Sequence, residues 1–311
     1  MTSRPLILGV SQCLLGDAVR YDGTGAKEQW PFDECAELFT PRGICPEVGI
    51  GMSVPRDPIR LVGIAPSHRV VEVADSTIDR TSALQDFALA QLASISDLCG
   101  YVFMQNSPSC GLFRVKVYPP DGGPPLREGT GVYAAAVILA LPALPVEEAS
   151  RLFDSDVRMN FIERCFVYAR WLALAKPITE VELLQFHRQH KYLFMAHSLA
   201  GCYEAGQLIL DKQGDVAERA QTYIERLMLG LRLPATRKGH IHVLRLLRDR
   251  LRRELHTGQL DPLDRSIEGY RRAESPLGES LALQRSHFEP YTEDYSCHRS
   301  YLELGLHRHC A

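Results

Sequence analysis

Three cysteines in the first half of the chain lie where a reactive centre could form. Cys13, Cys45 and Cys110 each accompany an apolar run and lie on a turn marked by Gly or Pro. An apolar run that ends in such a turn is typical of a buried strand. In a parallel sheet, sites are built at the carboxyl ends of the strands. We therefore hypothesise that these thiols, far apart in the sequence, converge on one point.

The same cysteines also have a simpler interpretation. Free cysteine often packs as a small apolar side chain, the gaps between the three are long, and no C-x-x-C pair supports an iron–sulfur or zinc site. From the residues alone, core packing and metal binding both stay open. The other six cysteines lack this turn context, and we expect them to pack in the core or to lie on the surface without a function: Cys35, Cys99, Cys165, Cys202, Cys297 and Cys310.

Four segments, in chain order, resemble the thiouracil desulfidase (TudS) family: Ser11–Gly16, Val19–Gly23, Cys45–Glu47 with Pro55–Arg56, and Ser107–Gly111. The resemblance spans roughly residues 5–150. It implies an α/β fold that carries a [4Fe-4S] cluster held by only three cysteines. The matching positions are Cys13, Cys45 and Cys110. Three thiolates leave one iron open, which is the position that a catalytic metal needs.

The resemblance also implies a non-redox desulfidase. A thiocarbonyl sulfur is soft and binds an open iron in preference to a harder site. Binding withdraws electrons from the carbon of the C=S group, so water can attack this carbon and the sulfur can leave, which converts R–C=S to R–C=O. Glu47 is the expected acid or base, Ser107 would orient water or the base, and Ser11 and Ser109 are weaker candidates. Their simpler roles would be a salt bridge or helix start for Glu47 and hydrogen bonds to the cluster sulfurs for the serines.

Arginines near these motifs are candidate substrate contacts. Arg20 and Arg56 could hold a phosphate or a base, as could Arg42, although lone arginines are usually surface charges.

A second group of residues with possible function lies in the basic segment Arg237–Arg253, which holds seven Lys or Arg residues and one acid. Leu244, Leu247 and Leu251 form an apolar stripe at helical spacing, and the arginines fall on another face. A solvated helix face is the default explanation. A basic stripe that follows the phosphates of a nucleic acid is the more specific one.

Three further segments resemble the helical domain of unknown function that is often fused to TudS domains: Phe186–Lys191, Met195–Ser198 and Pro234–His240. Fused enzymes of this layout, called RudS, desulfurate 4-thiouridine in transfer RNA. The resemblance covers about residues 178–270 and weakens after His242, and the family's final motif is not found in 290–311. It implies that transfer RNA is a partner and that its contacts include His187, Lys191, Arg237, Lys238 and Arg245. His187 and His190 lack the nearby carboxylates that would favour a metal site.

The elements that must position the cysteines alternate between strands and helices. Strands are predicted at Leu6–Val10, Arg42–Cys45, Val70–Val73 and Tyr101–Gln105, and helices at Asp79–Leu98 and Tyr133–Leu141. After Pro177 the strand signals vanish, and helices are predicted at Glu180–Leu199, Gly201–Leu210, Val216–Leu229 and His240–His256. We expect an α/β N-terminal domain with a parallel, Rossmann-like sheet, followed by an all-α C-terminal domain.

The predicted domains are residues 1–160, a helical joint at 161–177, and 178–311; the tail from Ser275 onward has only weak periodicity. Residues 1–160 hold 13 Lys or Arg and 19 Asp or Glu, whereas the remainder is mildly basic and holds 10 of the 11 histidines. This asymmetry suggests separate tasks for the two halves.

Nine dispersed cysteines in a chain of 311 residues favour a reduced compartment over a disulfide scaffold. The start of the chain lacks the features of a signal peptide, and Val132–Leu144 is too short to span a membrane. We expect a cytoplasmic protein that does not bind a membrane. Its substrate would be 4-thiouridine in transfer RNA, alternatively a free thiolated base or nucleoside. A non-catalytic iron–sulfur or zinc RNA-binding protein is the third alternative.

Overall fold

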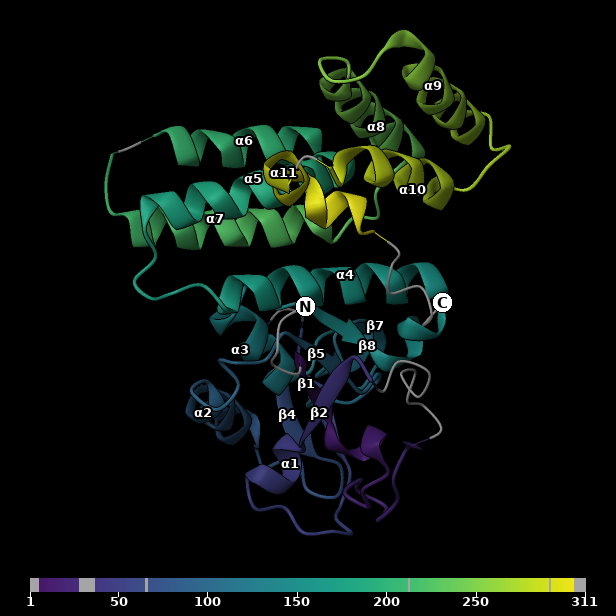
Figure 1. The fold of residues 1–311 in the computed structure, drawn as a ribbon. Helices are drawn as coiled ribbons and strands as arrows, with labels where there is room; N and C mark the ends of the chain where they lie inside the picture. The colour runs from purple at the N-terminus through teal and green to yellow at the C-terminus, as the bar shows by residue number, and fades with distance from the viewer. Residues whose placement is uncertain (1–5, 28–36, 65–66, 212, 291, 305–311) are drawn as a thin grey trace. The chain divides into compact units, whose positions relative to one another are not determined.

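The computed structural model describes residues 6–27, 37–64, 67–211, 213–290 and 292–304 (Figure 1). Cys35 and Cys310 lie outside these ranges. The chain divides into two compact units, and the boundary between Ala169 and Arg170 falls inside helix α4 (Ser155–Leu172). The division into 1–160, 161–177 and 178–311 stays a prediction.

The first unit contains the predicted parallel sheet. Its strand order is β2 (Phe39–Ile44), β1 (Leu6–Ser11), β5 (Gly100–Phe103) and β8 (Val146–Glu148), and all neighbours are parallel. Strands β1 and β5 are almost entirely buried, as expected for a parallel sheet covered on both faces.

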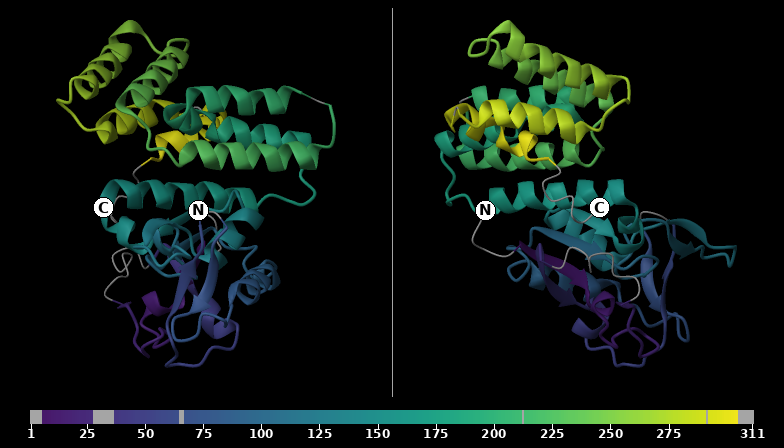
Figure 2. Two further views of the ribbon diagram at one scale, coloured as in Figure 1. Left: turned by 180° about the vertical axis from the view of Figure 1, so that it is seen from behind. Right: turned by 45° about the vertical axis from the view of Figure 1, so that its right-hand side comes forward.

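Helices flank this sheet, as Figure 2 shows. Leu8, Val10 and Val102 belong to one buried cluster with Phe161 and Cys165 of α4. Tyr101 and Phe103 point to the opposite face, because neighbouring strand residues alternate. Both rings lie edge-on to Tyr133 of α3 (Val132–Ala140), with ring centroids 6.4 and 6.3 Å away. Helix α2 (Thr81–Gln91) packs against α3.

A second, mixed sheet was largely missed by the sequence analysis. Its order is β4 (Arg69–Glu72), β3 (Ile59–Val62), β6 (Val115–Tyr118) and β7 (Leu126–Gly129), with antiparallel β3–β4 and β6–β7 pairs. Of these strands only β4 was predicted, at Val70–Val73 and as part of the parallel sheet; it pairs antiparallel with β3 instead, and the fourth strand of the parallel sheet, β8, was not predicted. The other three strands of the mixed sheet have only four residues each, and two of the four in β7 are charged, so their apolar signal is weak. The predicted Pro119–Pro125 loop joins β6 to β7.

The second unit is helical, as predicted. Its first four helices agree with the periodicity and are α5 (Glu180–His197), α6 (Leu199–Leu210), α7 (Val216–Leu231) and α8 (Arg237–Leu251). Helix α5 begins with a capping box, in which Thr179 and Glu182 bond each other's backbone N–H groups.

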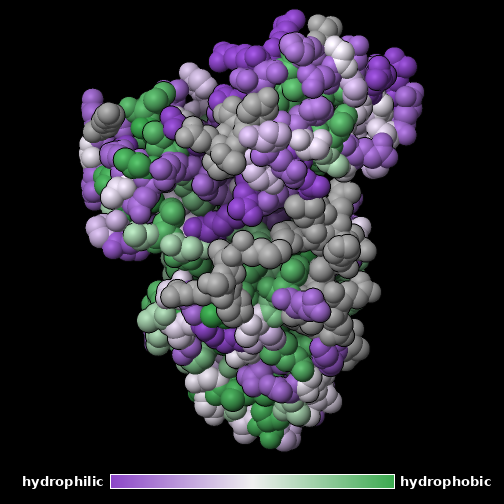
Figure 3. Space-filling model, viewed as in Figure 1, coloured by the Kyte–Doolittle hydropathy of each residue, from purple (hydrophilic) through white to green (hydrophobic). Residues whose placement is uncertain are grey.

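Three more helices follow within the predicted all-helical region, although the sequence predicted no bounds for them and its periodicity is weak from Ser275 onward: α9 (Thr257–Arg271), α10 (Leu277–Phe288) and α11 (Thr292–Leu302). Their apolar residues are few, yet Leu263, Phe288 and Tyr301 enter one buried cluster with α8. Figure 3 shows mostly hydrophilic side chains over the visible face of α8 and α9. No helix in the described ranges is long and apolar enough to cross a membrane.

Candidate functional site

The three cysteines follow three adjacent strands of the parallel sheet. Cys13 lies two residues after β1, in the short 3-10 helix η1 (Gln12–Leu15). Cys45 directly follows β2 and precedes helix α1 (Pro46–Gly49). Cys110 lies in the loop between β5 and β6. Because β2, β1 and β5 are neighbours and parallel, their carboxyl ends bring the three thiols to one edge of the sheet.

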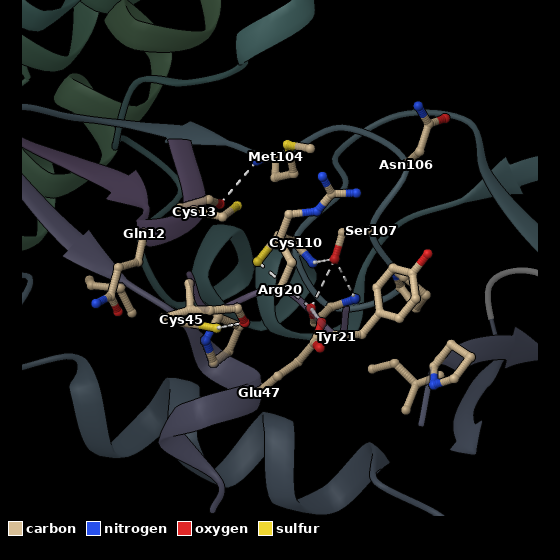
Figure 4. Close-up of a pocket in the computed structure, with 18 of the residues that line it drawn as sticks. Gln12, Cys13, Arg20, Tyr21, Cys45, Glu47, Met104, Asn106, Ser107 and Cys110 are labelled. Carbon is tan, nitrogen blue, oxygen red and sulfur yellow. Dashed lines mark hydrogen bonds between the residues drawn. The ribbon is translucent and has the colours of Figure 1, made fainter. Parts of the chain in front are cut away.

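A cavity of about 480 Å³ opens at this edge. Figure 4 shows the sulfurs of Cys13, Cys45 and Cys110 turned toward the same side of it. The lining also holds the predicted residues Ser11, Arg20, Glu47, Arg56 and Ser107, together with Tyr21, Ser109 and Gln12. The structure therefore brings together the site residues predicted in the first unit except Arg42, which pairs with Asp97 outside the cavity.

The cavity thiols are free cysteines that surround a space rather than a point. Within the described part of the chain, no three His, Cys, Asp or Glu side chains are grouped as the ligands of a single metal ion. An iron–sulfur cluster is a larger body, in which each thiolate binds a different iron. Three soft sulfur donors around one cavity suit such a cluster.

The thiols hold their protons strongly in the absence of a metal. Burial, with the nearby Cys45, raises the pKa of the Cys13 thiol to about 11, although Arg20 opposes this effect. Burial also raises the pKa of Cys45 and Cys110. Binding of a metal to these thiols must therefore release protons.

Glu47 is held from two sides. Arg56 donates from Nε and Nη2 to Oε2 of Glu47 at 2.8 and 2.6 Å, and Ser109 donates from Oγ to Oε1 at 2.6 Å. Only 5% of the Arg56 side chain and 13% of the Glu47 side chain are exposed. Arg56 further donates to the carbonyl oxygens of Val19 and Ser53. Its guanidinium thus positions Glu47 and the neighbouring loops, whereas the sequence had suggested a substrate contact.

Ser107 extends this network into the loop that carries Cys110. Its Oγ accepts from the N–H groups of Cys110 (3.1 Å) and Ser109 (3.3 Å) and lies 2.9 Å from Oγ of Ser109. Ser109 has one proton, which it donates to Glu47, so Ser107 must be the donor between the two hydroxyls. The result is a directed chain from Ser107 through Ser109 to Glu47. Ser109 had been only a weaker candidate.

Ser11 has a structural position. It is buried, and its Oγ accepts from Met104 N at 2.9 Å, which ties the end of β1 to the end of β5. Its hydroxyl also lowers the pKa of Cys110, against the larger effect of burial. Ser11 therefore supports the cysteine loop.

The first turn of α3 supports the same loop. Val132 N donates to the carbonyl oxygen of Pro108, and Ala134 N donates to that of Ser109, both at 3.1 Å. This close approach requires Gly131, because a Cβ there would lie 2.5 Å from the carbonyl of Ser109. The sequence offered only a glycine before an apolar helix as a signal.

Glu148, at the end of β8, anchors the residues after Cys110. Its Oε1 accepts from the N–H groups of Leu112 (2.8 Å) and Phe113 (3.0 Å). Burial raises the pKa of this carboxyl group, and the two N–H donors oppose the shift. The role of Glu148 was not predicted, because nothing local marks a buried carboxylate 36 residues from its partner.

The loop between η1 and the rim of the cavity carries Arg20 and Tyr21. Asp22 accepts from both the N–H and the hydroxyl of Thr24, and Gly23 N donates to the carbonyl oxygen of Arg20. Arg56 N also donates to the carbonyl oxygen of Tyr21. The guanidinium of Arg20 donates no hydrogen bond to any described residue, so it is open to a ligand in the cavity.

The structure places the predicted RNA contacts in different surroundings. His187 is mostly buried beside Tyr223, whose hydroxyl is 3.3 Å from its Nδ1, and burial lowers the pKa of His187 to about 4. It is therefore uncharged at neutral pH. Lys191 lies half-buried over the ring of Tyr192, and burial lowers its pKa.

Helix α8 holds the other three predicted contacts. Arg237 donates to the carbonyl oxygen of Tyr270 and stacks over its ring, so it ties α8 to α9. Lys238 and Arg245 are exposed, lie seven residues apart on one face, and form no ion pair with a described residue. These two match the expected phosphate contacts best.

Two family models match the chain. Residues 8–149 match the model of 2-thiouracil desulfurase, and residues 191–304 match that of DUF1722, a protein family of unknown function. The second match reaches past residue 270, where the sequence resemblance was expected to end. It includes α9, α10 and α11, whose bounds were not predicted.

Two known proteins are similar to parts of the chain. The uncharacterized protein YbgA of Escherichia coli (strain K12) is 26% identical over 129 residues, which are 41% of this chain and 76% of YbgA. A solved structure of the [4Fe-4S]-dependent thiouracil desulfidase TudS is 25% identical, with a TM-score of 0.36. It covers 48% of this chain and 93% of its own.

Proposed function

We propose that this chain, whose residues 8–149 match the model of the 2-thiouracil desulfurase family, hydrolyses the C=S group of 4-thiouridine in transfer RNA to C=O. The observation that carries the proposal is the meeting of Cys13, Cys45 and Cys110 with Glu47 on one cavity. The reaction is a non-redox hydrolysis, in which R–C=S and water give R–C=O and hydrogen sulfide.

Cys13, Cys45 and Cys110 would hold a [4Fe-4S] cluster in this cavity. Thiolates are the usual ligands of such clusters, and the three free thiols face a shared space. When bound, the cluster supplies an iron without a protein ligand, which is a soft Lewis acid for the thiocarbonyl sulfur.

Glu47 would take the proton of the attacking water. Ser107 donates to Ser109 and Ser109 donates to Oε1 of Glu47, so the two hydroxyls hold the carboxylate for this transfer, and Oε1 keeps a second lone pair for the water. Arg56 keeps the carboxylate in place through Oε2. The reverse transfer would return the proton to the departing sulfide.

The helical unit would bind the RNA. Lys238 and Arg245 on α8 supply exposed cations that could pair with phosphates. The nearest alternative is the same chemistry on a free thiolated base or nucleoside, for which the exposed cations would be irrelevant. A non-catalytic RNA-binding protein with a structural cluster or zinc ion is the other alternative. The free thiols suit a reducing compartment, and we place the protein in the cytoplasm.

The test is anaerobic reconstitution with iron and sulfide, followed by incubation with thiolated transfer RNA or with free 4-thiouridine. Nucleoside composition and released sulfide are measured. We expect conversion of 4-thiouridine to uridine in the RNA at a rate that falls steeply with salt. Equal rates on the free nucleoside, without salt dependence, would favour the first alternative. Loaded protein that releases no sulfide from either compound would favour the second.

Matched variants assign the outcome to the two units. Glu47→Gln keeps the size of the side chain and should retain the iron while losing about 100- to 10,000-fold in turnover. Lys238→Glu with Arg245→Glu should slow only the reaction of the RNA. Arg226→Glu, which removes an exposed arginine of α7 that pairs with Glu204, serves as the control for surface charge.

A further inference from the structure

Tyr21 presents a large aromatic side chain at the cavity that holds the three thiols. The side chain lines this cavity, and 45% of the residue is exposed. Within the described ranges, its ring contacts no other aromatic ring and its hydroxyl has no hydrogen-bond partner. The ring therefore has a free face or edge that a ligand could cover.

The backbone of Tyr21 is fixed although its ring is not covered. Its carbonyl oxygen accepts from Arg56 N at 2.9 Å, and the preceding Val19 carbonyl accepts from Arg56 Nη2, also at 2.9 Å. On the other side, Asp22 caps the N–H and hydroxyl of Thr24. An aromatic ring on a preorganised loop costs little entropy when it binds a flat ligand.

The order of the groups across the cavity gives a ligand a direction. Figure 4 shows the thiols of Cys13 and Cys45 on one side and the Tyr21 ring on the other, with Ser107 and Glu47 between them. A ligand whose sulfur faces the thiols and whose reacting carbon lies beside Ser107 must extend the rest of its body toward Tyr21.

We infer that the Tyr21 ring is the wall on which the heterocycle of a thiolated nucleobase stacks, so that the site selects aromatic thiocarbonyl compounds over open-chain thioamides. The inference rests on the proposed function and names the substrate feature that this site recognises. Stacking of a base on an aromatic side chain is insensitive to the exocyclic groups. It would therefore hold the ring and leave the sulfur position to the thiols.

The experiment compares Tyr21→Ala and Tyr21→Phe with the unaltered protein, all reconstituted anaerobically. Two substrates are used: 4-thiouridine, and thioacetamide, which has no ring. Binding of uridine, which cannot lose sulfur, is measured separately by calorimetry. Equal iron content in all three proteins verifies that the cavity still forms.

We expect Tyr21→Ala to weaken uridine binding and raise the KM for 4-thiouridine by about 5- to 150-fold. The kcat for 4-thiouridine should change less, and sulfide release from thioacetamide should stay the same. Tyr21→Phe keeps the ring and should match the unaltered protein. Unchanged uridine binding by Tyr21→Ala, or equal losses with thioacetamide and 4-thiouridine, would overturn the inference.

The outcomes also separate this inference from the proposed reaction. Uridine binding that depends on Tyr21, in a protein that releases no sulfide, would reject the reaction and support the stacking wall. Normal sulfide release, together with uridine binding that is unchanged in Tyr21→Ala, would support the reaction and reject the stacking wall.

Discussion

Oγ of Ser109 lies 2.6 Å from Oε1 of Glu47 and joins two cysteine-bearing segments that are 62 residues apart in the sequence. Glu47 follows Cys45 by two residues, and Ser109 directly precedes Cys110. One hydrogen bond therefore fixes the spacing of two thiols and also places a carboxylate beside them. The arrangement of the cluster ligands and the position of the proposed base therefore depend on the same hydrogen bond.

Loss of any cavity thiol should abolish binding of the cluster. Cys13→Ser, Cys45→Ser and Cys110→Ser each replace a soft sulfur by a hard, weakly acidic hydroxyl. We expect less than about a tenth of the iron of the unaltered protein after anaerobic reconstitution, measured by iron content and visible absorbance. Cys202→Ala, which changes a buried free cysteine of α6 outside the cavity, is the control and should retain all of the iron.

The pair of Arg56 and Glu47 should show strong coupling in a double-mutant cycle. Arg56→Met leaves a mostly buried carboxylate unpaired and should lower the free energy of unfolding by about 3 kcal/mol. Glu47→Gln in the same chain removes the unpaired charge, so the double variant should regain part of this loss. Urea unfolding of the four proteins measures the coupling. Additive losses would show that the two side chains act independently.

Gly131→Ala should disturb the loop of Cys110 from outside the cavity. The added Cβ would meet backbone atoms of Ser109 at 2.5 Å, and a backbone segment cannot yield as a flexible side chain can. We expect a loss of about 1–3 kcal/mol in stability together with reduced iron content. Gly278→Ala adds the same methyl group where no atom lies within 4 Å, so its iron content should be unchanged.

Buried histidines should make the stability of the helical unit depend on pH. Burial lowers the pKa of His187 to about 4 and that of His190 to about 3, with Lys191 and Arg170 adding smaller effects. An unfolded chain has the ordinary histidine pKa of about 6.5 and binds more protons below it. The free energy of unfolding should therefore fall as the pH decreases from about 6.5 toward 4.

The slope of this loss approaches about 1.4 kcal/mol per pH unit for each histidine. Urea unfolding midpoints between pH 7 and pH 4.5 measure it. The variant His187→Gln with His190→Gln should flatten the curve, whereas His242→Gln, on the exposed face of α8, should not. Equal slopes for both variants would assign the pH dependence to other groups.

Local sequence patterns were sufficient for much of the architecture. An apolar run before Cys13, Cys45 or Cys110 predicts a strand that ends in a turn, and three such units predict a parallel sheet with thiols at one edge. The 3.6-residue period likewise predicted α5 to α8. Both signals lie within a few residues of the feature that they predict, because side-chain direction repeats with the period of the element.

The short strands β3, β6, β7 and β8 and the helices α9 to α11 have no comparable pattern in the sequence. Leu263 and Tyr301 are buried by segments that are distant in the chain, so the residues next to them in the sequence carry little information about their burial. Their placement depends on tertiary packing, which overrides weak local preference.

By itself, the sequence determined which thiols could meet, because strand direction and turn position are local properties. Only the tertiary structure decided which groups act together with them. In the folded chain Arg56 pairs with Glu47, and Ser109 donates to the same carboxylate. Arg237 donates to the carbonyl oxygen of Tyr270, and the Tyr21 side chain stays exposed. Each of these contacts joins side chains from different segments, and the free energy of a hydrogen bond or a stack depends on geometry that only the folded chain defines.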